Sequence, residues 1–483
     1  MFCSCDKWLD VKPQGQSLDK ELFSTQKGFQ DALIGAYIRL GSSDLYGGNL
    51  TWGMVEHMAL NWDQPSSGTD NTLAALRDGN YSNAGVRTLL DNTFKTQYKV
   101  VADVNAILTY IDENKNVFEP NYYEIIKGEA LGLRALSHFT AIQLFGPIPT
   151  NVGAKKWLPY VKSIGKEIPD GLTFNEFMNM LLADLDEAER LLENADPVLN
   201  FTFSELKTGV QPDGFLRDRD TRINFYSILA LKARVFQWLA ASDEKYKEKA
   251  FTYAKLIIDA KVHGVSPYRL GVESDRVAGD YTMSAEHIFA LNAYNLDSRV
   301  DAIFGPDGTL FRYDFFNFTP DGFYYLSNLF LPNERATDIR WKDMWVYKTK
   351  AGSENYVYYK KFLQRDANPI NRIPIIRLSE AYLIATEFAP SKQEADAFYK
   401  IYCDAKGIVF DANGFAAAEW ENDRYNKILR EYVREFYAEG HSFFQYKRNN
   451  VVMLPAQWTY FYYNATESKY LVPKPDREID YNK

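Results

Sequence analysis

Three glutamates near the carboxyl terminus have the residue type and the spacing to do acid/base chemistry. In the stretch REYVREFYAEGHSFFQYKR, residues 430–448, Glu431, Glu435 and Glu439 follow one another at intervals of four, and His441 comes two residues later. Residues at i and i+4 share one face of a helix, so the carboxylates are expected to line one side of a helix that ends at the histidine. Unpaired carboxylates on one face repel, and this repulsion raises a pKa as acid/base catalysis requires.

The composition of the same stretch favours a structural role. Arg434 follows Glu431 at i+3, and further cations lie at Lys427, Arg430, Lys447 and Arg448. Carboxylates that cations can neutralise usually stabilise packing. An apolar stripe on the same predicted helix also indicates that it packs against a core: Ile428, Leu429, Tyr432, Val433 and Phe436. We therefore favour a packing element over a catalytic site.

The elements that must position these residues are predicted to be mainly helical. Apolar residues recur with helical period, and Gly146 with Pro147 marks the end of one helix. Repeated helix pairs with alanine at close-contact positions suggest tetratricopeptide-like packing, although the strict repeat is matched only loosely. The predicted helices cover residues 29–38, 97–112, 122–145, 174–194, 223–241, 246–260, 377–388, 392–405 and 424–439.

Two long regions lack helical period. They cover residues 41–87 and 262–371 and are rich in Gly, Asp, Tyr, Phe and Trp. Loops of this length are usually functional or disordered, and their aromatic content argues against disorder. The chain contains 33 Tyr, 32 Phe and 9 Trp, which suggests wet surfaces with aromatic faces in addition to an aromatic core.

Composition and missing motifs exclude several classes of protein. The net charge is −9 and no cluster of Lys and Arg is present, which argues against nucleic-acid binding. No run of eighteen apolar residues occurs, so we expect no membrane-spanning helix. GxGxxG, P-loop, GxSxG and HExxH motifs are absent, and the five histidines lack metal-ligand spacing. We therefore predict no cofactor. The loop aspartates miss the spacing of a calcium loop and are better explained as turn residues: Asp297, Asp301, Asp307 and Asp314.

The three cysteines have different expected roles. Their odd number argues against a disulfide scaffold. Cys403 lies in an apolar helical stretch and is predicted to be a buried free thiol. Cys3 and Cys5 stand at the amino terminus in the sequence MFCSCDKWLD.

The carboxy-terminal stretch resembles the signature of SusD/RagB-type proteins, the nutrient-binding outer-membrane lipoproteins of Bacteroidetes. The residues that match that signature are Ile428, Glu431, Glu435, Phe436, Glu439, Gly440 and Arg448. Tyr432, His441 and Gln445 stand where Arg, Arg and Asp are usual, which is expected to weaken a local salt-bridge network. The resemblance implies that the row of glutamates is a packing element and that the protein is not an enzyme.

Further segments resemble the family in the right order. They are CDKWLDVKP at the start, EALGLRALSHFTAIQLFGPIPT, the D-x-R of Asp338 and Arg340, RIPIIRLSEAYLIATE, and LVPKPDREIDYNK at the end. The resemblance implies one SusD-like domain over residues 1–483. Its expected parts are an anchor and extended segment (1–24), tetratricopeptide-like helices (25–261) with the loop 41–87, an irregular ligand-face insertion (262–371) and carboxy-terminal helices (372–483).

The resemblance gives the amino terminus a role. Cys5 would be the acylated residue of a lipobox, with Cys3 as the alternative, and the lipid would anchor the protein at the cell surface. Two or three acyl chains hold a protein stably at a membrane. A free thiol without lipid remains the plain alternative.

The resemblance also implies a ligand and a partner. Family members bind oligosaccharide on a shallow face and pass it to a SusC-type TonB-dependent barrel in the outer membrane. Sugars offer C–H faces to aromatic rings and hydroxyl edges to polar groups. The two aromatic-rich regions therefore supply our candidate ligand residues, although any one of these aromatics is more often a packing residue: Trp52, Trp62, Asp63, Tyr81, Phe323, Tyr324, Tyr325 and Trp341.

Two other functions remain open at this point. An all-helical glycoside hydrolase would need two carboxylates flanking a cleft, and Asp63 with Asp70 is the nearest loop pair. A tetratricopeptide adaptor would bind a peptide in its groove. A raised carboxylate pKa in a cleft would favour the enzyme, whereas exposed aromatics without such a carboxylate would favour a glycan-binding protein.

Overall fold

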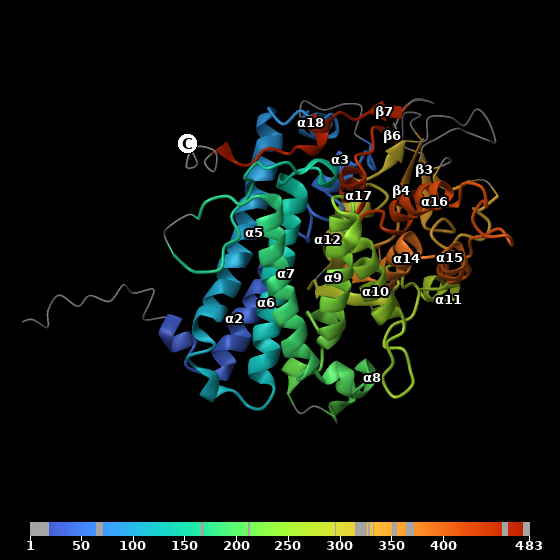
Figure 1. The fold of residues 1–483 in the computed structure, drawn as a ribbon. Coiled ribbons are helices and arrows are strands. Elements are labelled where there is room, and N and C mark those ends of the chain that lie inside the picture. The colour runs from blue at the N-terminus through green and yellow to red at the C-terminus, as the bar shows by residue number, and fades with distance from the viewer. Residues whose placement is uncertain are drawn as a thin grey trace, which may run out of the picture.

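The computed structural model is mostly helical, with a few short strands (Figure 1). The residues that the structure describes are 19–63, 71–165, 169–210, 213–294, 296–313, 326, 329–331, 333–349, 355–363, 371–455 and 462–476. Within them, no helix is both long enough and apolar enough to cross a membrane.

The amino-terminal half is a series of helices that pack on one another in chain order, as predicted. Neighbours α5 and α6, α6 and α7, and α9 and α10 are packed pairs, and Figure 1 shows α5, α6 and α7 running side by side. This is the tetratricopeptide-like scaffold. Its main helices are α2 (Gln26–Leu40), α5 (Ala84–Tyr110), α6 (Tyr122–Phe145), α7 (Phe174–Glu193), α9 (Phe225–Ala240) and α10 (Lys247–Ile258).

The ends of these helices follow local chemistry. Thr173 caps α7, because its hydroxyl accepts from the Glu176 N–H while the Glu176 side chain accepts from the Thr173 backbone. Helix α6 ends at Phe145 with Gly146 at the C-cap, as the sequence predicted. Helix α5 begins at Ala84, thirteen residues before the predicted start, because Asn83 caps it through the N–H of Val86.

The carboxy-terminal helices pack against this scaffold through α14, which contacts α10, α15 and α16. These helices are α14 (Leu378–Phe388), α15 (Lys392–Lys406), α16 (Trp420–Glu435) and α17 (Ser442–Arg448). The prediction that one helix continues to residue 439 is wrong. Ala438 and Gly440 adopt the left-handed conformation with φ of 67° and 81°, so the helix stops at Glu435 and Glu439 lies in the turn that follows.

The two long regions contain more regular structure than the sequence indicated. The first holds α3 (Met54–Met58) and α4 (Thr72–Arg77), and the second holds α11 (Glu273–Val277) and α12 (Leu296–Phe304). Strand β1 (His287–Asn292) pairs antiparallel with β5 (Arg372–Arg377). A second antiparallel sheet has the order β2-β4-β3, formed by β2 (Arg312–Tyr313), β4 (Asn355–Tyr359) and β3 (Trp345–Thr349).

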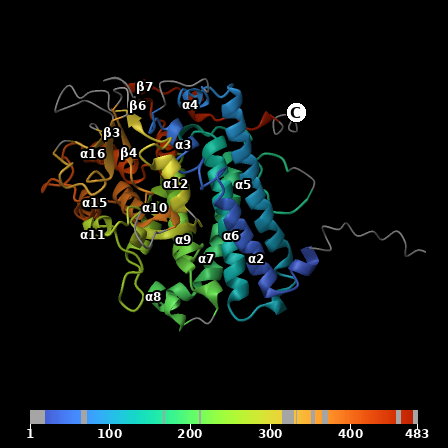
Figure 2. The same cartoon turned by 180° about the vertical axis from the view of Figure 1, so that it is seen from behind.

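The remaining elements are short. Strands β6 (Met453–Pro455) and β7 (Tyr462–Asn464) form a hairpin, and α18 (Glu467–Tyr470) follows it. Helix α8 (Phe203–Glu205) lies at the opposite end of the molecule from α18 in Figure 1, and from β7 in the view from behind (Figure 2).

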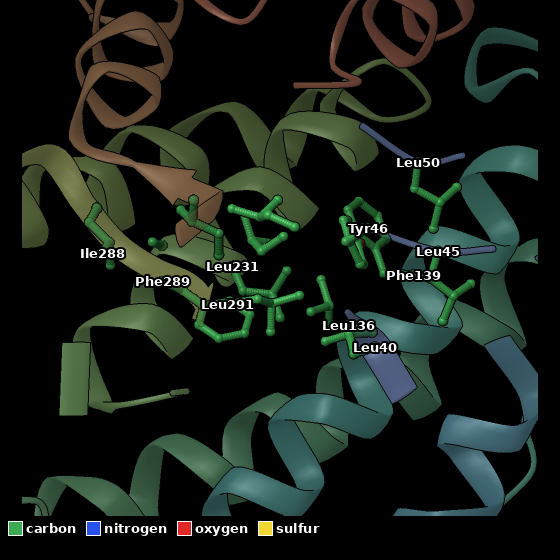
Figure 3. Packing of buried hydrophobic residues seen from close by; sticks show 14 of the residues in the cluster. Leu40, Leu45, Tyr46, Leu50, Leu136, Phe139, Leu231, Ile288, Phe289 and Leu291 are labelled. Carbon is green, nitrogen blue, oxygen red and sulfur yellow. The ribbon is translucent and has the colours of Figure 1, made fainter. Parts of the chain in front are cut away.

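One large apolar core joins the helical scaffold to the inserted strands. Figure 3 shows Leu136 and Phe139 of α6, Leu231 of α9 and the β1 side chains Ile288, Phe289 and Leu291 in one packed cluster. Leu40, Leu45, Tyr46 and Leu50, which surround the start of the first long region, point into the same core. The regions outside the regular helices are therefore built into the core.

Candidate functional site

The glutamate row is a buried ion-pair cluster. The Arg377 guanidinium contacts Glu435 at 2.6 Å and Glu439 at 2.8 Å, and Arg340 contacts Glu431 at 2.6 Å. All three carboxylates lie in the interior, exposed by 0 to 5%. Two lysines supply further positive charge: Lys361, which follows β4, lies beside Glu439, and Lys406 at the end of α15 lies beside Glu435.

The electrostatics of this cluster are unsuited to acid/base catalysis. Burial acts to raise the pKa of Glu435, but Lys406, Arg377 and Arg340 together hold it well below its usual value. Burial lowers the pKa of His441 well below its usual value, and its ring stacks on Phe436 at 4.3 Å. A permanently ionised carboxylate in a closed interior has no substrate to act on, so we interpret the row as a packing element.

The D-x-R motif belongs to the same cluster. Arg340 forms a bidentate pair with Asp338, with Nη2 to Oδ2 at 2.7 Å, and also donates to the Tyr402 hydroxyl at 2.8 Å. The motif therefore ties the second long region to α15 and α16.

Three of the predicted ligand residues lie inside the protein. Trp52, Trp62 and Asp63 are exposed by only 3%, 1% and 2%. The Trp62 indole N–H donates to the Trp52 carbonyl at 2.9 Å, and both rings make edge contacts with Phe304. These rings offer no open face to a sugar, so the structure gives them a packing role that the sequence did not reveal.

Asp63 and Tyr81 have structural contacts as well. The Asp63 carboxylate lies 3.3 Å from the Arg312 guanidinium, and the backbone N–H of Asp63 donates to the Phe311 carbonyl at 3.0 Å. The half-buried Tyr81 hydroxyl donates to the Lys469 carbonyl at 2.5 Å. The remaining candidates Phe323, Tyr324 and Tyr325, together with Asp70 and Cys5, lie outside the described residues.

Trp341 is the predicted ligand residue that the structure places in a surface cleft. This cleft, of about 800 Å³, is the Trp341 cleft. It is formed within the second long region, where the sequence predicted a ligand face. Its lining residues are Arg276, Val277, Tyr281, Arg335, Trp341, Lys342, Asp343, Trp345, Val346, Tyr347 and Lys360.

Salt bridges hold the walls of the cleft together. Arg276 of α11 pairs with Glu273 at 2.8 Å on its own helix and with Asp343 at 3.0 Å across the cleft. The hydrogen bonds from Arg276 lower the pKa of Glu273 to about 2, so this carboxylate stays ionised. Asp343 adopts a left-handed conformation with φ of 52°, two residues before β3 begins. The pairs therefore fix α11 against the turn that leads into β3.

The cleft combines aromatic faces with hydrogen-bond donors. Tyr347 of β3 is 60% exposed, whereas Trp341 and Tyr281 are half-buried. The Arg335 guanidinium lies 4.5 Å from the centre of the Trp341 ring, and the Lys360 ammonium lies 5.0 Å from that of Tyr281. Such a lining can bind the C–H face of a sugar and donate to its oxygens.

Trp345 forms the floor of the cleft. It is 6% exposed and stacks on Tyr359 at 4.4 Å. Its indole N–H has no hydrogen-bond partner among the described residues. This N–H is itself shielded from solvent, so its missing hydrogen bond is a cost of packing, roughly 1–3 kcal/mol.

The charged residues in the described lining of the cleft do not form the pair that hydrolysis requires. Asp343 is the one carboxylate among the described residues of the lining. The carboxylate whose pKa burial raises to about 7 is Glu56, which is fully buried and accepts from Asn61, Ala438 and Gly440. The acid with a raised pKa and the open cleft are therefore in different places. The described residues also contain no group of three or more His, Cys, Asp or Glu that could hold a metal ion.

Comparison with known proteins follows the resemblance seen in the sequence. Residues 7–204 match the SusD-like family described as "Starch-binding associating with outer membrane". A 153-residue stretch is 25% identical to the SusD-like protein P25 of Formosa agariphila, and this stretch covers 30% of the chain and 28% of that relative. The amino-terminal part of the chain is therefore similar to this SusD-like family.

Solved structures extend the likeness to the whole fold. A SusD superfamily protein from Bacteroides thetaiotaomicron has a TM-score of 0.71 at 20% identity, covering 95% of this chain and 98% of that one. A SusD-like carbohydrate binding protein from Bacteroides vulgatus has a TM-score of 0.68 at 18% identity, covering 95% and 96%. Surface glycan-binding protein A from B. thetaiotaomicron has a TM-score of 0.65 at 18% identity, covering 95% and 98%.

Most of the cleft residues were missed from the sequence. Tyr281, Trp345 and Tyr347 lie in the predicted ligand-face insertion, so the region was recognised while the individual side chains were not. Alternation in the β3 sequence WVYKT does not single out Tyr347, because it places Trp345 on the same face although Trp345 is only 6% exposed.

Proposed function

We propose that this SusD-like protein binds an oligosaccharide in the Trp341 cleft, without cleaving it, and delivers it to a SusC-like TonB-dependent transporter. The observation that supports this most directly is the cleft itself, which joins an exposed aromatic ring to a set of fixed donors. The family described as starch-binding and outer-membrane associated, together with the glycan-binding structural neighbours, agrees with this role.

The alternatives proposed from sequence have less support. A glycoside hydrolase needs two carboxylates on either side of the sugar, and Asp343 has no such partner among the described lining residues. A peptide-binding adaptor would use a groove in the helical scaffold, whereas this cleft lies in the insertion between the helices.

The test is isothermal calorimetry against an oligosaccharide panel, with mass spectrometry to detect cleavage. Tyr347→Ala is expected to weaken binding roughly tenfold or more, because stacking on an aromatic ring is worth about 1–3 kcal/mol. Tyr294→Ala is the matched control, since Tyr294 is 87% exposed but lies outside the cleft lining.

Three outcomes would contradict the proposal. An equal loss of affinity in both tyrosine variants would show that the cleft is not the binding site. Cleavage products would show an enzyme. Binding that survives Tyr347→Ala unchanged would place the glycan elsewhere on the surface.

We also propose that Cys5 carries the lipid that holds the protein at the outer membrane. In cells that express the protein behind a complete signal sequence, Cys5→Ala is expected to release it from the membrane fraction, and Cys3→Ala is the control. Membrane retention of the Cys5 variant in a strain without the partner barrel would overturn this assignment.

The delivery step is tested by purifying the protein from cells that express the barrel. We expect the barrel to co-purify with the protein, and its absence from the purified material would contradict delivery to this transporter.

A further inference from the structure

The charged groups on the α11 wall of the Trp341 cleft are already paired with one another. Arg276 donates to Glu273 on its own helix at 2.8 Å and to Asp343 across the cleft at 3.0 Å. The Lys342 ammonium lies 3.3 Å from the same Glu273 carboxylate. These contacts hold α11 in place, and they commit the charged side chains of this wall to one another.

The side chain that the α11 wall leaves open is apolar. Val277, the last residue of α11, lines the cleft and is 70% exposed. An exposed apolar side chain that stands alone is ordinary on a protein surface. Val277 does not stand alone, because the cleft is also lined by Val346, which is half-buried, and by Tyr347, which is 60% exposed. The cleft therefore presents apolar surface from two elements, α11 and β3.

This apolar surface bears on which group of a sugar can lie against α11. The C–H face of a sugar ring can stack on Tyr347, but the edge of an unmodified hexose carries hydroxyl groups. A hydroxyl placed against Val277 would lose hydrogen bonds to water and gain none from the valine. A methyl group in the same place would bury apolar surface of its own and of the valine, which is favourable. A methyl group therefore complements this wall better than a hydroxyl does.

The wall is also prepared for such a contact before a ligand arrives. Arg276 ties α11 to the Asp343 side chain and, at 3.4 Å, to the Lys342 carbonyl. A valine side chain has few rotamers because it branches at Cβ. Little conformational freedom is then lost when a ligand binds, so the contact should keep most of its value.

We infer that the sugar bound in this cleft carries a methyl group, and that Val277 is the residue that selects for it. This inference rests on the proposed function and adds the chemical class of the ligand. Two kinds of sugar supply such a group: a 6-deoxyhexose, through its terminal carbon, and an N-acetylhexosamine, through its acetyl group.

The first experiment compares sugars that differ in a single methyl group. The purified full chain is titrated, with binding followed by ligand-observed NMR, with L-fucose and L-galactose and with L-rhamnose and L-mannose. In each pair a methyl group stands where the other sugar has a hydroxymethyl group. N-acetylglucosamine and N-formylglucosamine form the third pair, which tests the acetyl source. We expect the methyl-bearing sugar of at least one pair to bind roughly fivefold more tightly, the effect of burying one methyl group.

The second experiment assigns the preference to Val277. Val277→Thr replaces one methyl group of the side chain by a hydroxyl and keeps its shape. We expect this change to remove most of the preference while the sugar without the methyl group binds almost as before. Val409→Thr is the matched control, because Val409 is 78% exposed but lies outside the cleft lining. Thermal melts of both variants check that the fold is intact.

The outcomes separate this inference from the proposed function. Equal binding within every pair, or tighter binding of the sugars without the methyl group, would overturn the inference and leave sugar binding established. A preference that Val277→Thr leaves unchanged would overturn it too, because the methyl group would then bind elsewhere. Failure of all six sugars to bind would also overturn it; oligosaccharides that bind in a Tyr347-dependent way would then still uphold the proposed function.

Discussion

Replacing Glu435 by glutamine tests whether the carboxy-terminal signature is a structural element. The Glu435 carboxylate contacts Arg377 at 2.6 Å and Arg340 and Lys406 at 3.3 Å each, and the residue is 3% exposed. Removing one partner of a buried ion pair costs about 3–5 kcal/mol. Each of the three cations retains another carboxylate, so we expect a loss near the lower end, about 3 kcal/mol.

The assay is urea unfolding of the two proteins at pH 7, followed by circular dichroism. Glu187→Gln is the matched control, because Glu187 forms an i, i+3 pair with Arg190 at 2.6 Å on the surface of α7. Exposed pairs contribute about 0–1 kcal/mol, so the control should unfold almost like the wild type. A loss in Glu435→Gln no larger than that of the control would refute the structural interpretation.

The pH dependence of Glu435→Gln gives a second test. The surrounding cations hold the folded pKa of Glu435 well below its ordinary value of 4.5. The ionised form therefore stabilises the fold fully above about pH 4.5, and this contribution is lost as pH falls through the depressed folded pKa. The difference in unfolding free energy between wild type and variant should be largest at pH 7 and should narrow below pH 4.5. A difference that grows as the pH falls would contradict the assigned charge state.

Three further predictions concern buried positions. Trp62→Ala is expected to lower the unfolding free energy by about 3–5 kcal/mol, because this 1% exposed ring packs in the core; a melting temperature within a few degrees of wild type would contradict this. Gly440→Ala should destabilise more than Gly153→Ala in urea unfolding: both glycines have positive φ, but only at Gly440 would the new Cβ meet a backbone atom, the Leu50 carbonyl oxygen at 2.0 Å. Cys403, 0% exposed and with a pKa that burial raises, should not react with a thiol reagent until urea unfolds the protein; fast reaction of the native protein would show an open core.

The helical scaffold could be predicted from sequence because each helix repeats its apolar residues with one period. Helices α6, α7 and α9 agree with their predicted ranges within two residues at each end. The end of α16 was missed, since Ala438 adopts a left-handed conformation that alanine rarely takes and that tertiary contacts must impose. Gly440 was the available signal, and it lies five residues beyond the true end.

The short strands could not be predicted in the same way. Strands β1 and β5 read HIFALN and RIPIIR, short apolar runs without alternation because both faces are buried. Such runs cannot be told from buried helix by periodicity. The sheet forms between residues about 85 positions apart, which no local pattern reveals.

The residues of the Trp341 cleft were hard to predict because residue type does not distinguish an exposed aromatic ring from a buried one. Trp62 and Tyr347 both lie in aromatic-rich regions, yet one is 1% and the other 60% exposed. The difference comes from partners distant in sequence: Trp62 contacts Phe304 and Tyr437, at 6.0 and 5.0 Å between ring centres. Tryptophan and tyrosine were both predicted as sugar platforms, and the larger apolar ring of tryptophan is the one that the core can use most.

The carboxy-terminal signature and the cleft are physically connected. Trp345, the floor of the cleft, makes an edge contact with Tyr437 at 5.0 Å, and Tyr437 follows Glu435 by two residues. The Lys361 ammonium donates to the carbonyls of Glu435 and Tyr437 at 2.8 and 3.2 Å, and the neighbouring Lys360 lines the cleft. The buried charges thus fix the backbone on which the floor and one cation of the cleft rest. Under the proposed function, this buried signature would affect binding without contacting the ligand, because it holds Trp345 and Lys360 in place relative to Tyr347.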